Sequence, residues 1–420
     1  MSISIALMEQ AFAIFTLVFF TGILAFDSLY ISPDPALAES QSSINPLYSI
    51  LSLVQMGVYG TTILLLLLRW RSSVRTALQN KTIWLIIILT LSSFLWSDFF
   101  DGSLRKGINA FATSLFGFYL ASRFSLREQI KLLMVSLGIV TLVSFLFSLA
   151  FPGAAIEAGA NAGSWRGPLT QKNLLARVML LSSFVFFFDM LKQPIKQRKI
   201  HYALISLSLL LVLLSNSKTA LLILFILLML TPLYLSLKLE GRILIPILIS
   251  LILLVGSSTT ILLSNWENIT IALGRDPTLS GRTELWDAAF DMIAARPLLG
   301  YGFQSFWIDD GAATYIWKLV QYRPPHAHNG YINIALDLGL IGLFLFVLNL
   351  TITYSRSIRW AKLEGTIWGL FPLIYITFLI IYNQSENTIV EHNSIFWALF
   401  VSLSFVVSDK QQLKLIYTKD

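Results

Sequence analysis

The chain has 420 residues, of which 56% are hydrophobic and only 13% are charged, and its mean hydropathy is +0.72. Soluble domains carry about 25% charged residues, so this composition excludes a soluble globular protein and predicts one that uses lipid as a solvent. The absence of cysteine excludes disulfides and thiolate chemistry. The net charge of +7 is interpreted as the basic bias of inner membrane loops, and no nucleic-acid partner is predicted.

Apolar runs near twenty residues recur along the chain, which is the length a helix needs to cross about 30 Å of hydrocarbon. Runs such as ILLLLL and LLILFILLML do not alternate as the strands of a membrane barrel would. We predict an all-α polytopic membrane protein, a single integral membrane domain over 1–420 with twelve transmembrane helices. The predicted spans are 8–26, 47–68, 82–96, 107–121, 132–150, 173–191, 201–215, 219–237, 243–264, 329–353, 366–382 and 392–408.

The distribution of basic residues predicts the orientation. With both termini inside, the inner segments hold nineteen of the thirty lysines and arginines, whereas the outer loops at 27–46 and 383–391 hold none. Positive residues collect in inner loops, so an even number of spans with cytoplasmic termini fits. The first span has no basic flank, and we do not expect a signal peptide there. Residues 201–237 could form one bent helix, but we interpret SNSKT as a tight outer turn.

One outer segment, 265–328, is much longer than the other connections. Long loops in compact proteins are usually functional or disordered, and this one contains the stretch SGRTELWDAAFDMIAARPLLGYG. Ser280 can cap a helix of about four turns, which Pro297 would follow. An apolar stripe opposes an acidic face; the stripe is Leu285, Ala289, Met292 and Ile293, and the acidic residues are Glu284, Asp287 and Asp291.

Arg282 stands in the first turn of this predicted helix, where the helix dipole disfavours a cation. The ordinary interpretation is an arginine paired with a glutamate or a lipid phosphate. The functional interpretation is a guanidinium that grips phosphate oxygens in pairs, beside the backbone donors of the helix N-terminus.

Further basic residues collect on the predicted outer face, where the positive-inside rule makes them unexpected. Arg166 and Lys172 lie in the loop SWRGPLTQKN, Arg177 lies about one turn into the next span, and Lys218 lies in the turn SNSKT. An ionisable residue inside a span is costly and is mostly functional or paired. A lone lysine in a turn is a weak signal. Together the four predict an anionic, lipid-linked ligand such as a diphosphate.

Two of the four histidines, His326 and His328, lie just before the span 329–353, with Asn329 as a good N-cap. A neutral imidazole at this position can take a proton from an attacking hydroxyl. We favour this role for His328, and simple hydrogen bonding for His326. The HAH triplet supplies only two metal ligands, and no DxD, P-loop or dinucleotide motif occurs, so no metal and no cofactor are predicted.

The order of these motifs resembles a known family. GRTELWDAAFDMIAARPLLGYGFQSF, then HNGYINIALDLGLIG, resembles the hallmark region of the O-antigen ligase and Wzy-type polymerase superfamily. SWRGPLTQKN is similar to the RG-x-x-x-KN loop of its exopolysaccharide-polymerase branch. The resemblance implies that Arg282 binds the diphosphate and that His328 is catalytic. A second family arginine is replaced here by Lys218, which keeps the charge but lacks the bidentate fork. We hypothesise that Arg166 or Arg177 compensates for this replacement.

The resemblance implies a GT-C-like, metal-independent, inverting glycosyltransferase of the bacterial inner membrane whose active site faces the periplasm. The donor would be a glycan on undecaprenyl diphosphate, and a chain-length regulator and a flippase are implied partners. We predict a polymerase that extends the glycan. A ligase that transfers it to lipid A-core or another acceptor is the alternative, and a transporter, for example of inorganic carbon, is a second one.

Overall fold

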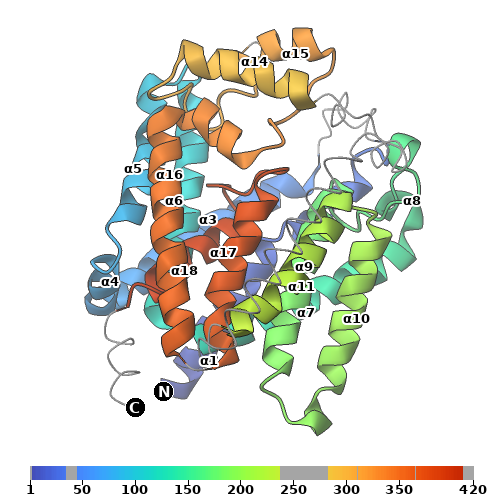
Figure 1. Cartoon of the computed structure of the whole chain (residues 1–420), viewed down its shortest axis with the longest axis vertical. Coiled ribbons are helices and arrows are strands. Elements are labelled where there is room, and N and C mark those ends of the chain that lie inside the picture. Colours follow the sequence, from blue (N-terminus) through green and yellow to red (C-terminus); the bar gives the residue numbers. More distant parts are fainter. Residues whose placement is uncertain (1, 35–44, 237–281, 310, 365, 410–420) are drawn as a thin grey trace. The chain divides into compact units, whose positions relative to one another are not determined.

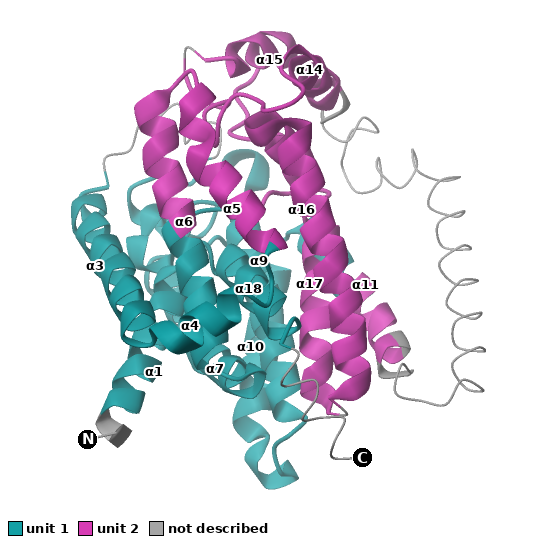
Figure 2. Cartoon of the chain, turned by 90° about the vertical axis from the view of Figure 1, so that its left-hand side faces the viewer, with its two compact units in different colours: residues 1–81, 112–225, 390–412 teal, residues 82–111, 226–389, 413–420 magenta. Residues whose placement is uncertain are grey.

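The structure is a computed structural model that describes residues 2–34, 45–236, 282–309, 311–364 and 366–409. These residues form helices and turns, with one isolated antiparallel bridge between Ile156 and Trp165. This confirms the all-α prediction. The chain divides into two compact units, which are coloured separately in Figure 2. The first comprises Met1–Lys81, Ala112–Phe225 and Val390–Gln412, and the second comprises Thr82–Phe111, Ile226–Ile389 and Leu413–Asp420.

In the first unit, α7 packs against α1, α9 and α10. Two helices are shared, because α6 (Phe100–Arg123) enters this unit at Ala112 and α11 (Lys218–Ser236) leaves it after Phe225. The other helices of this unit are α1 (Ser2–Phe19), η1 (Ile23–Ala25), η2 (Asp27–Leu29), α3 (Leu47–Leu68), α4 (Trp70–Ala77), α7 (Leu126–Ala150), α8 (Pro152–Ala155), η4 (Gly159–Asn161), α9 (Lys172–Met190), η5 (Ile195–Gln197), α10 (Lys199–Leu214) and α18 (Ile395–Val406).

The second unit is built around α16, which packs against α5, α14 and α17. Helices α14 and α15 lie across one end of α16 (Figure 1). The helices of this unit, besides the shared ones, are α5 (Thr82–Ser92), η3 (Ser93–Trp96), α14 (Arg282–Ala295), α15 (Ala313–Val320), α16 (Gly330–Leu363), η6 (Ile367–Leu370) and α17 (Phe371–Tyr382).

The predicted spans coincide with helices wherever the structure describes them, and the span at 243–264 lies outside the described residues. The SNSKT turn is confirmed, because α10 ends at Leu214 and α11 begins at Lys218. Two predicted inner loops were too long. Helix α7 begins at Leu126, where Ser125 and Glu128 form a capping box that the prediction overlooked. Helix α16 continues to Leu363, well beyond the predicted end at 353.

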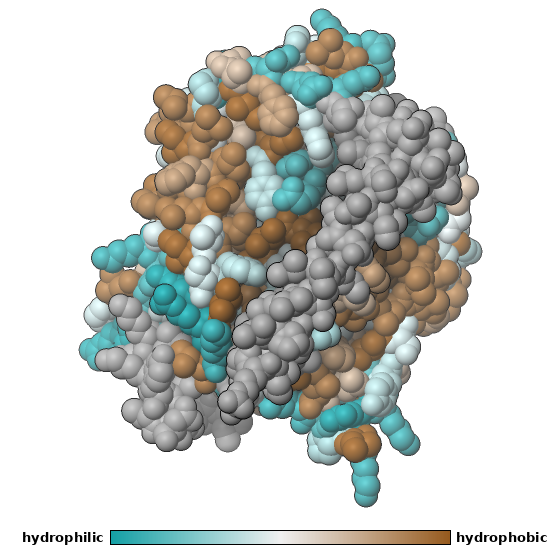
Figure 3. All heavy atoms as spheres, in the orientation of Figure 1, coloured by the Kyte–Doolittle hydropathy of each residue, from teal (hydrophilic) through white to brown (hydrophobic). Residues whose placement is uncertain are grey.

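Four described helices are long and apolar enough to cross a membrane, and two bent pairs raise the number to six. The four are Leu47–Leu68, Leu126–Ala150, Lys172–Met190 and Gly330–Leu363. Figure 3 shows hydrophobic side chains gathered on the side of the molecule where α5 and α16 lie. Leu85 and Ile88 on α5, and Phe344 and Val347 on α16, are exposed there. Exposed apolar area of this kind suits contact with lipid, and the chain is a polytopic membrane protein; twelve spans remain a prediction.

The predicted amphipathic helix is confirmed as α14, which begins at Arg282. Its buried face is the apolar stripe, with Leu285 and Ala289 fully buried, and its exposed face carries Glu284 and Asp287. The stripe packs against buried residues of α15 and α16. These contacts join the large loop to the helix that follows the histidines.

Candidate functional site

The two histidines lie directly before α16, at a helix start fixed by Asn329. The side-chain Oδ1 of Asn329 accepts hydrogen bonds from the N–H groups of Tyr331 at 2.9 Å and Ile332 at 3.2 Å. Asparagine is among the best N-cap residues because it satisfies donors that have no partner within the helix. The N-cap prediction is therefore confirmed, and it fixes the backbone on which His328 stands.

The segment before His328 is held by side chains from three places in the large loop and α16. The indole N–H of Trp286 on α14 donates to the carbonyl of Ala327 at 2.8 Å. The Oδ1 atom of Asn333 accepts from the Ala327 N–H at 2.9 Å and from the Trp307 indole at 3.1 Å. Ala327 is fully buried. Both polar groups of this buried peptide are therefore satisfied, which leaves His328 little freedom to move.

His328 has a backbone φ of +50°, a region that residues other than glycine rarely adopt. This turn lets its own N–H donate to Nδ1 of His326 at 3.1 Å, and the two rings lie edge to face with centroids 4.3 Å apart. Because Nδ1 of His326 accepts a hydrogen bond, the proton of the neutral ring lies on Nε2. His326 thus supports the backbone of His328, as the sequence interpretation expected of a hydrogen-bonding residue.

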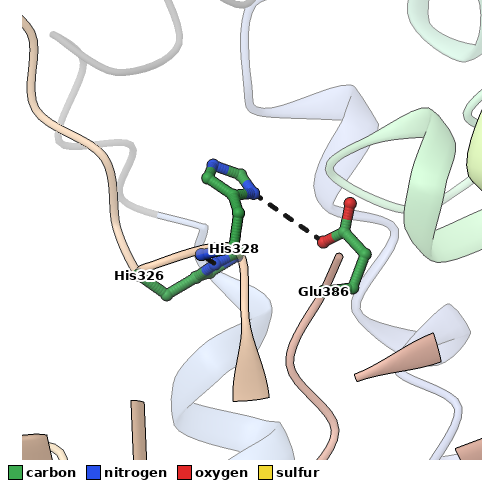
Figure 4. Close-up of side chains that lie close together, drawn as sticks. All are labelled: His326, His328 and Glu386. Carbon is green, nitrogen blue, oxygen red and sulfur yellow. Dashed lines mark hydrogen bonds and ion pairs between the residues drawn. The ribbon is translucent and has the colours of Figure 1, made fainter. Parts of the chain in front are cut away.

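The residue that faces His328 is Glu386, which the sequence analysis missed. Its Oε2 lies 3.9 Å from Nδ1 of His328, and the side chains are 10% and 26% exposed (Figure 4). Glu386 lies 58 residues after His328 in the sequence, so no local pattern links the two. The available signal was topological, because the loops at 265–328 and 383–391 were both predicted to be outer loops.

The loop that carries Glu386 is fixed to the start of α16. The N–H of Gly330 donates to the carbonyl of Asn383 at 2.9 Å, and the side chain of Asn383 accepts from the N–H of Thr388 at 2.8 Å. A Cβ at Gly330 would lie 2.5 Å from the Asn383 side-chain oxygen, so this position requires glycine. The His328–Glu386 pair therefore rests on two segments that are hydrogen-bonded to each other.

Possible metal ligands were also assessed. Within the described residues, His326, His328 and Glu386 offer ligand atoms that all lie within 4.8 Å of one another. Two imidazoles and a carboxylate are a donor set that zinc accepts. One of these nitrogens, Nδ1 of His326, already accepts the N–H of His328. The predicted absence of a metal stays a prediction.

The PLLGYG stretch after α14 docks into a break in α16. At Gly339 the backbone has φ 66° and ψ −170°, which interrupts the helix. The N–H groups of Leu340 and Ile341, which the break leaves without helical partners, donate to the carbonyls of Pro297 and Leu298 at 2.7 and 3.2 Å. The stretch therefore supplies acceptors that the helix lacks.

The stretch after α14 also donates hydrogen bonds to α16. The N–H groups of Tyr301 and Gly302 donate to the carbonyls of Leu336 and Asp337, each at 2.9 Å. A Cβ at Gly339 would lie 2.1 Å from the carbonyl oxygen of Leu298. The spacing of proline and glycine in this motif thus has a structural cause. It lets the backbone of residues 297–302 approach the backbone of α16 closely at Gly339. We refer to residues 297–302 and the break at Gly339 as the backbone clasp.

Of the predicted diphosphate ligands, Arg282 and Lys218 begin helices. Arg282 opens α14, but its side chain lies outside what the structure describes. Lys218 opens α11 and is half-buried. Their roles as substrate ligands stay predictions.

Arg166 has surroundings that explain it without a substrate. It is 1% exposed, and its guanidinium donates five hydrogen bonds of 2.8 to 3.2 Å to backbone carbonyls. The acceptors are Ser28, Ile31, Ser32, Ala154 and Thr170. A guanidinium has five N–H donors, so none is left for a phosphate in this arrangement. In the structure Arg166 joins the 28–32 and 154–170 segments, and its role as a substrate ligand stays a prediction.

Lys172 and Arg177 lie at the start of α9. The N–H of Lys172 donates to Oε1 of Glu157 at 2.7 Å, and its Nζ lies 3.4 Å from the Ser164 hydroxyl. Burial raises the pKa of Glu157 above its ordinary value of 4.5, although the Lys172 N–H opposes this shift. Arg177 pairs with Glu391, at 3.3 Å between Nη2 and Oε1. The first unit therefore holds Arg166, Lys172 and Arg177, and each has protein partners.

Residues 203–347 match the family model described as O-antigen ligase. This segment includes Lys218, Arg282, the backbone clasp and His328. This part of the chain is similar to the O-antigen ligase family. The resemblance inferred from the motifs is thereby confirmed.

The chain also matches parts of individual members of the superfamily. It is 32% identical over 92 residues to the exopolysaccharide production protein ExoQ of Rhizobium meliloti (strain 1021), covering 21% of each chain. It is 31% identical over 118 residues to RP358 of Rickettsia prowazekii (strain Madrid E), which is named as a polysaccharide ligase; the match covers 26% of this chain and 29% of that protein. The matched stretches thus span less than a third of these relatives.

Proposed function

We propose that the protein transfers a glycan from a lipid-linked diphosphate donor to a hydroxyl group of an acceptor, as a ligase. The observation that carries this proposal is the His328–Glu386 pair, held on the N-terminus of α16 in a chain whose residues 203–347 match the O-antigen ligase model. A base whose ring is oriented by a second group is the arrangement that hydroxyl activation needs.

In the proposed reaction, the acceptor oxygen attacks the anomeric carbon of the donor sugar. The bond between that carbon and the diphosphate oxygen breaks, and the lipid diphosphate leaves with the electron pair. The acceptor proton passes to Nε2 of His328, because Nδ1 faces Glu386. The carboxylate stabilises the imidazolium that forms. Arg282 and Lys218 stabilise the charge that develops on the diphosphate, and attack from the opposite face inverts the anomeric configuration.

Ligation is placed ahead of polymerisation, which the sequence analysis preferred. The family model is described as a ligase, and RP358 is named as one. The polymerase interpretation depended on the SWRGPLTQKN loop, whose Arg166 has its donors taken up by backbone carbonyls. Polymerisation remains the second candidate, because the match to ExoQ, named for exopolysaccharide production, favours it.

The proposal extends to the membrane setting. The donor is a glycan on undecaprenyl diphosphate, and the acceptor is lipid A-core or another glycan. The site faces the periplasm of the bacterial inner membrane, with twelve spans and both termini in the cytoplasm. Support comes from the lysine and arginine bias of the sequence and from the four to six candidate spans. A flippase and a chain-length regulator are the proposed partners.

The test uses membranes of a bacterial strain that lacks its own copy of this protein. Wild type, His328→Ala and Arg282→Ala would be expressed at equal levels, and lipid-linked and transferred glycans would be separated by size. We expect wild type to attach glycan to an acceptor, and both variants to accumulate it on the lipid. Arg323→Ala is the matched control, because Arg323 is an exposed arginine of the same loop, paired with Asp309.

The outcomes separate the candidates. If the variants accumulate short lipid-linked repeats and only the wild type makes long chains, the result would support the polymerase function in place of the ligase function. Wild-type glycans in both variants would refute the site. Treatment with EDTA is expected to leave transfer unchanged; a loss that zinc restores would instead assign His326, His328 and Glu386 to a metal.

A further inference from the structure

A polar cavity lies in the first unit, where α9 and α18 begin. Its volume is about 160 Å³. Charged and polar side chains line it, including Asp27, Arg177, Glu391, His392 and Ser394. The mechanism proposed above uses none of these as a base.

The floor of this cavity is rigid. Helix α18 is buried along its whole length. The side chain of Asn393 accepts from the Tyr59 hydroxyl at 2.6 Å and donates to Gln55 at 2.8 Å, and its N–H donates to the hydroxyl of Thr113 at 2.9 Å. These bonds fix the residue between His392 and Ser394. Sites held on well-packed elements keep their geometry when a ligand binds.

Ser394 lines this cavity. It occupies the N-cap position of α18, where serine normally accepts a helix N–H, yet its side chain makes no capping hydrogen bond. The side chain is 4% exposed, and its Oγ has no hydrogen-bond partner. Oε2 of Glu391 is likewise buried without a partner. Buried polar atoms without partners are costly, and a ligand in the cavity that these two residues line would reduce that cost.

The charge of the cavity selects the class of ligand. Arg177 is neutralised by Glu391 at 3.3 Å, and Asp27 adds a second carboxylate. With His392 neutral, the wall carries a formal charge of −1, which disfavours a phosphate or diphosphate. A neutral polyhydroxyl ligand fits, because its hydroxyls can donate to Glu391 and accept from Arg177, while Ser394 can do either.

The size of the cavity limits the ligand further. A water occupies about 30 Å³ in the liquid, so the space holds about five waters. Drug-sized molecules need cavities of about 300 to 1,000 Å³. One sugar ring is of the size that fits. Phe396 is also part of the wall, and the Arg177 guanidinium lies over its ring at 5.1 Å from the centroid.

We propose that this cavity binds one neutral sugar ring of the glycan that the protein handles, with Glu391, Arg177 and Ser394 as its polar ligands. This inference rests on the proposed function for the identity of the glycan. It changes the role predicted for Arg177 from a diphosphate ligand to a sugar ligand. Glu391 follows Glu386 by five residues in the sequence, so one loop supplies a carboxylate to each site.

Binding can be measured directly on the full-length protein in lipid nanodiscs. Saturation-transfer NMR would be recorded with methyl α-D-glucopyranoside, methyl α-D-galactopyranoside and methyl α-D-mannopyranoside. We expect at least one glycoside to bind the wild type. Binding should be lost in Ser394→Leu, which fills the cavity, and weakened about ten- to a hundredfold in Glu391→Gln. Ser394→Ala tests the hydroxyl without added volume, and Glu284→Gln is an exposed control.

Kinetics identify which glycan supplies the ring. A higher KM for the acceptor in Glu391→Gln, with kcat retained, assigns the cavity to the acceptor; a higher KM for the lipid-linked donor assigns it to the donor. The inference is overturned if no glycoside binds the wild type, or if Ser394→Leu and Glu391→Gln leave binding and both KM values unchanged.

A separate variant distinguishes this inference from the proposed function. His328→Ala should abolish transfer and leave glycoside binding intact. If His328→Ala transfers glycan as well as the wild type does, the proposed catalytic site falls, whatever the glycosides do. If glycosides bind in a Ser394-dependent manner but no glycan is transferred, the cavity stands as a sugar site and the transferase proposal fails.

Discussion

Replacing Glu386 by glutamine removes the charge that faces His328 and keeps the volume of the side chain. The two side chains are 26% and 10% exposed, so an effective dielectric of about 20 applies rather than that of water. At 3.9 Å the attraction between an imidazolium and a carboxylate is then about 4 kcal/mol. If roughly half of the positive charge has developed on the His328 ring in the transition state, the substitution removes about 2 kcal/mol of transition-state stabilisation. The value of kcat should then fall about 30-fold.

The assay is steady-state transfer from a defined lipid-linked oligosaccharide in nanodiscs, with Glu284→Gln as a control for the loss of one exposed glutamate. The donor KM should change little, because Glu386 acts through the base rather than on the donor. A Glu386→Gln variant with wild-type kcat would refute the reasoning, since the carboxylate would then do no more than complete the fold. A loss of folded protein would be recognised by size-exclusion chromatography.

Three further substitutions test the fold around the sites. Gly339→Ala should destabilise the protein by about 3 kcal/mol or more, because a Cβ would lie 2.1 Å from the Leu298 oxygen at a φ of 66°; Gly57→Ala, which meets nothing within 4 Å, is the control in a melting experiment. Arg166→Lys should lower the melting temperature and the folded yield, through about 2 to 5 kcal/mol of lost hydrogen bonding, without a specific rise in KM. Burial raises the pKa of Glu157, so its contribution to stability is fully present below about pH 4.5 and is lost as the pH rises through its folded pKa; Glu157→Gln should flatten that decline in melting curves from pH 4 to 8.

The helices were predictable because their causes are local. Residues 47–68 are an apolar run without a breaker, and α3 has those bounds. The stripe of Leu285 and Ala289 has helical spacing, and α14 buries it. The errors arose at polar helix ends. The start of α7 depends on the Ser125 capping box, and the end of α16 runs through charged residues that resembled a loop.

The site was predicted in part. His328 and Asn329 were found because proline, histidine and asparagine precede an apolar helix, and the structure fixes them as expected. Glu386 was missed because its proximity to His328 depends on the return of the chain through α17, which no local pattern encodes. The substrate-binding role of Arg166 stays a prediction, and sequence cannot tell whether a guanidinium faces a ligand or, as here, five carbonyls.

The backbone clasp has a consequence for biosynthesis. Residues 297–302 leave the ribosome before α16 does, so the partner of the break is already made when Gly339 emerges. Unsatisfied backbone groups cost several kcal/mol in hydrocarbon. The predicted span 329–353 contains the break at Gly339. We therefore expect insertion of α16 and docking of residues 297–302 to be coupled events, so that the loop that holds His328 is positioned as the helix enters the bilayer.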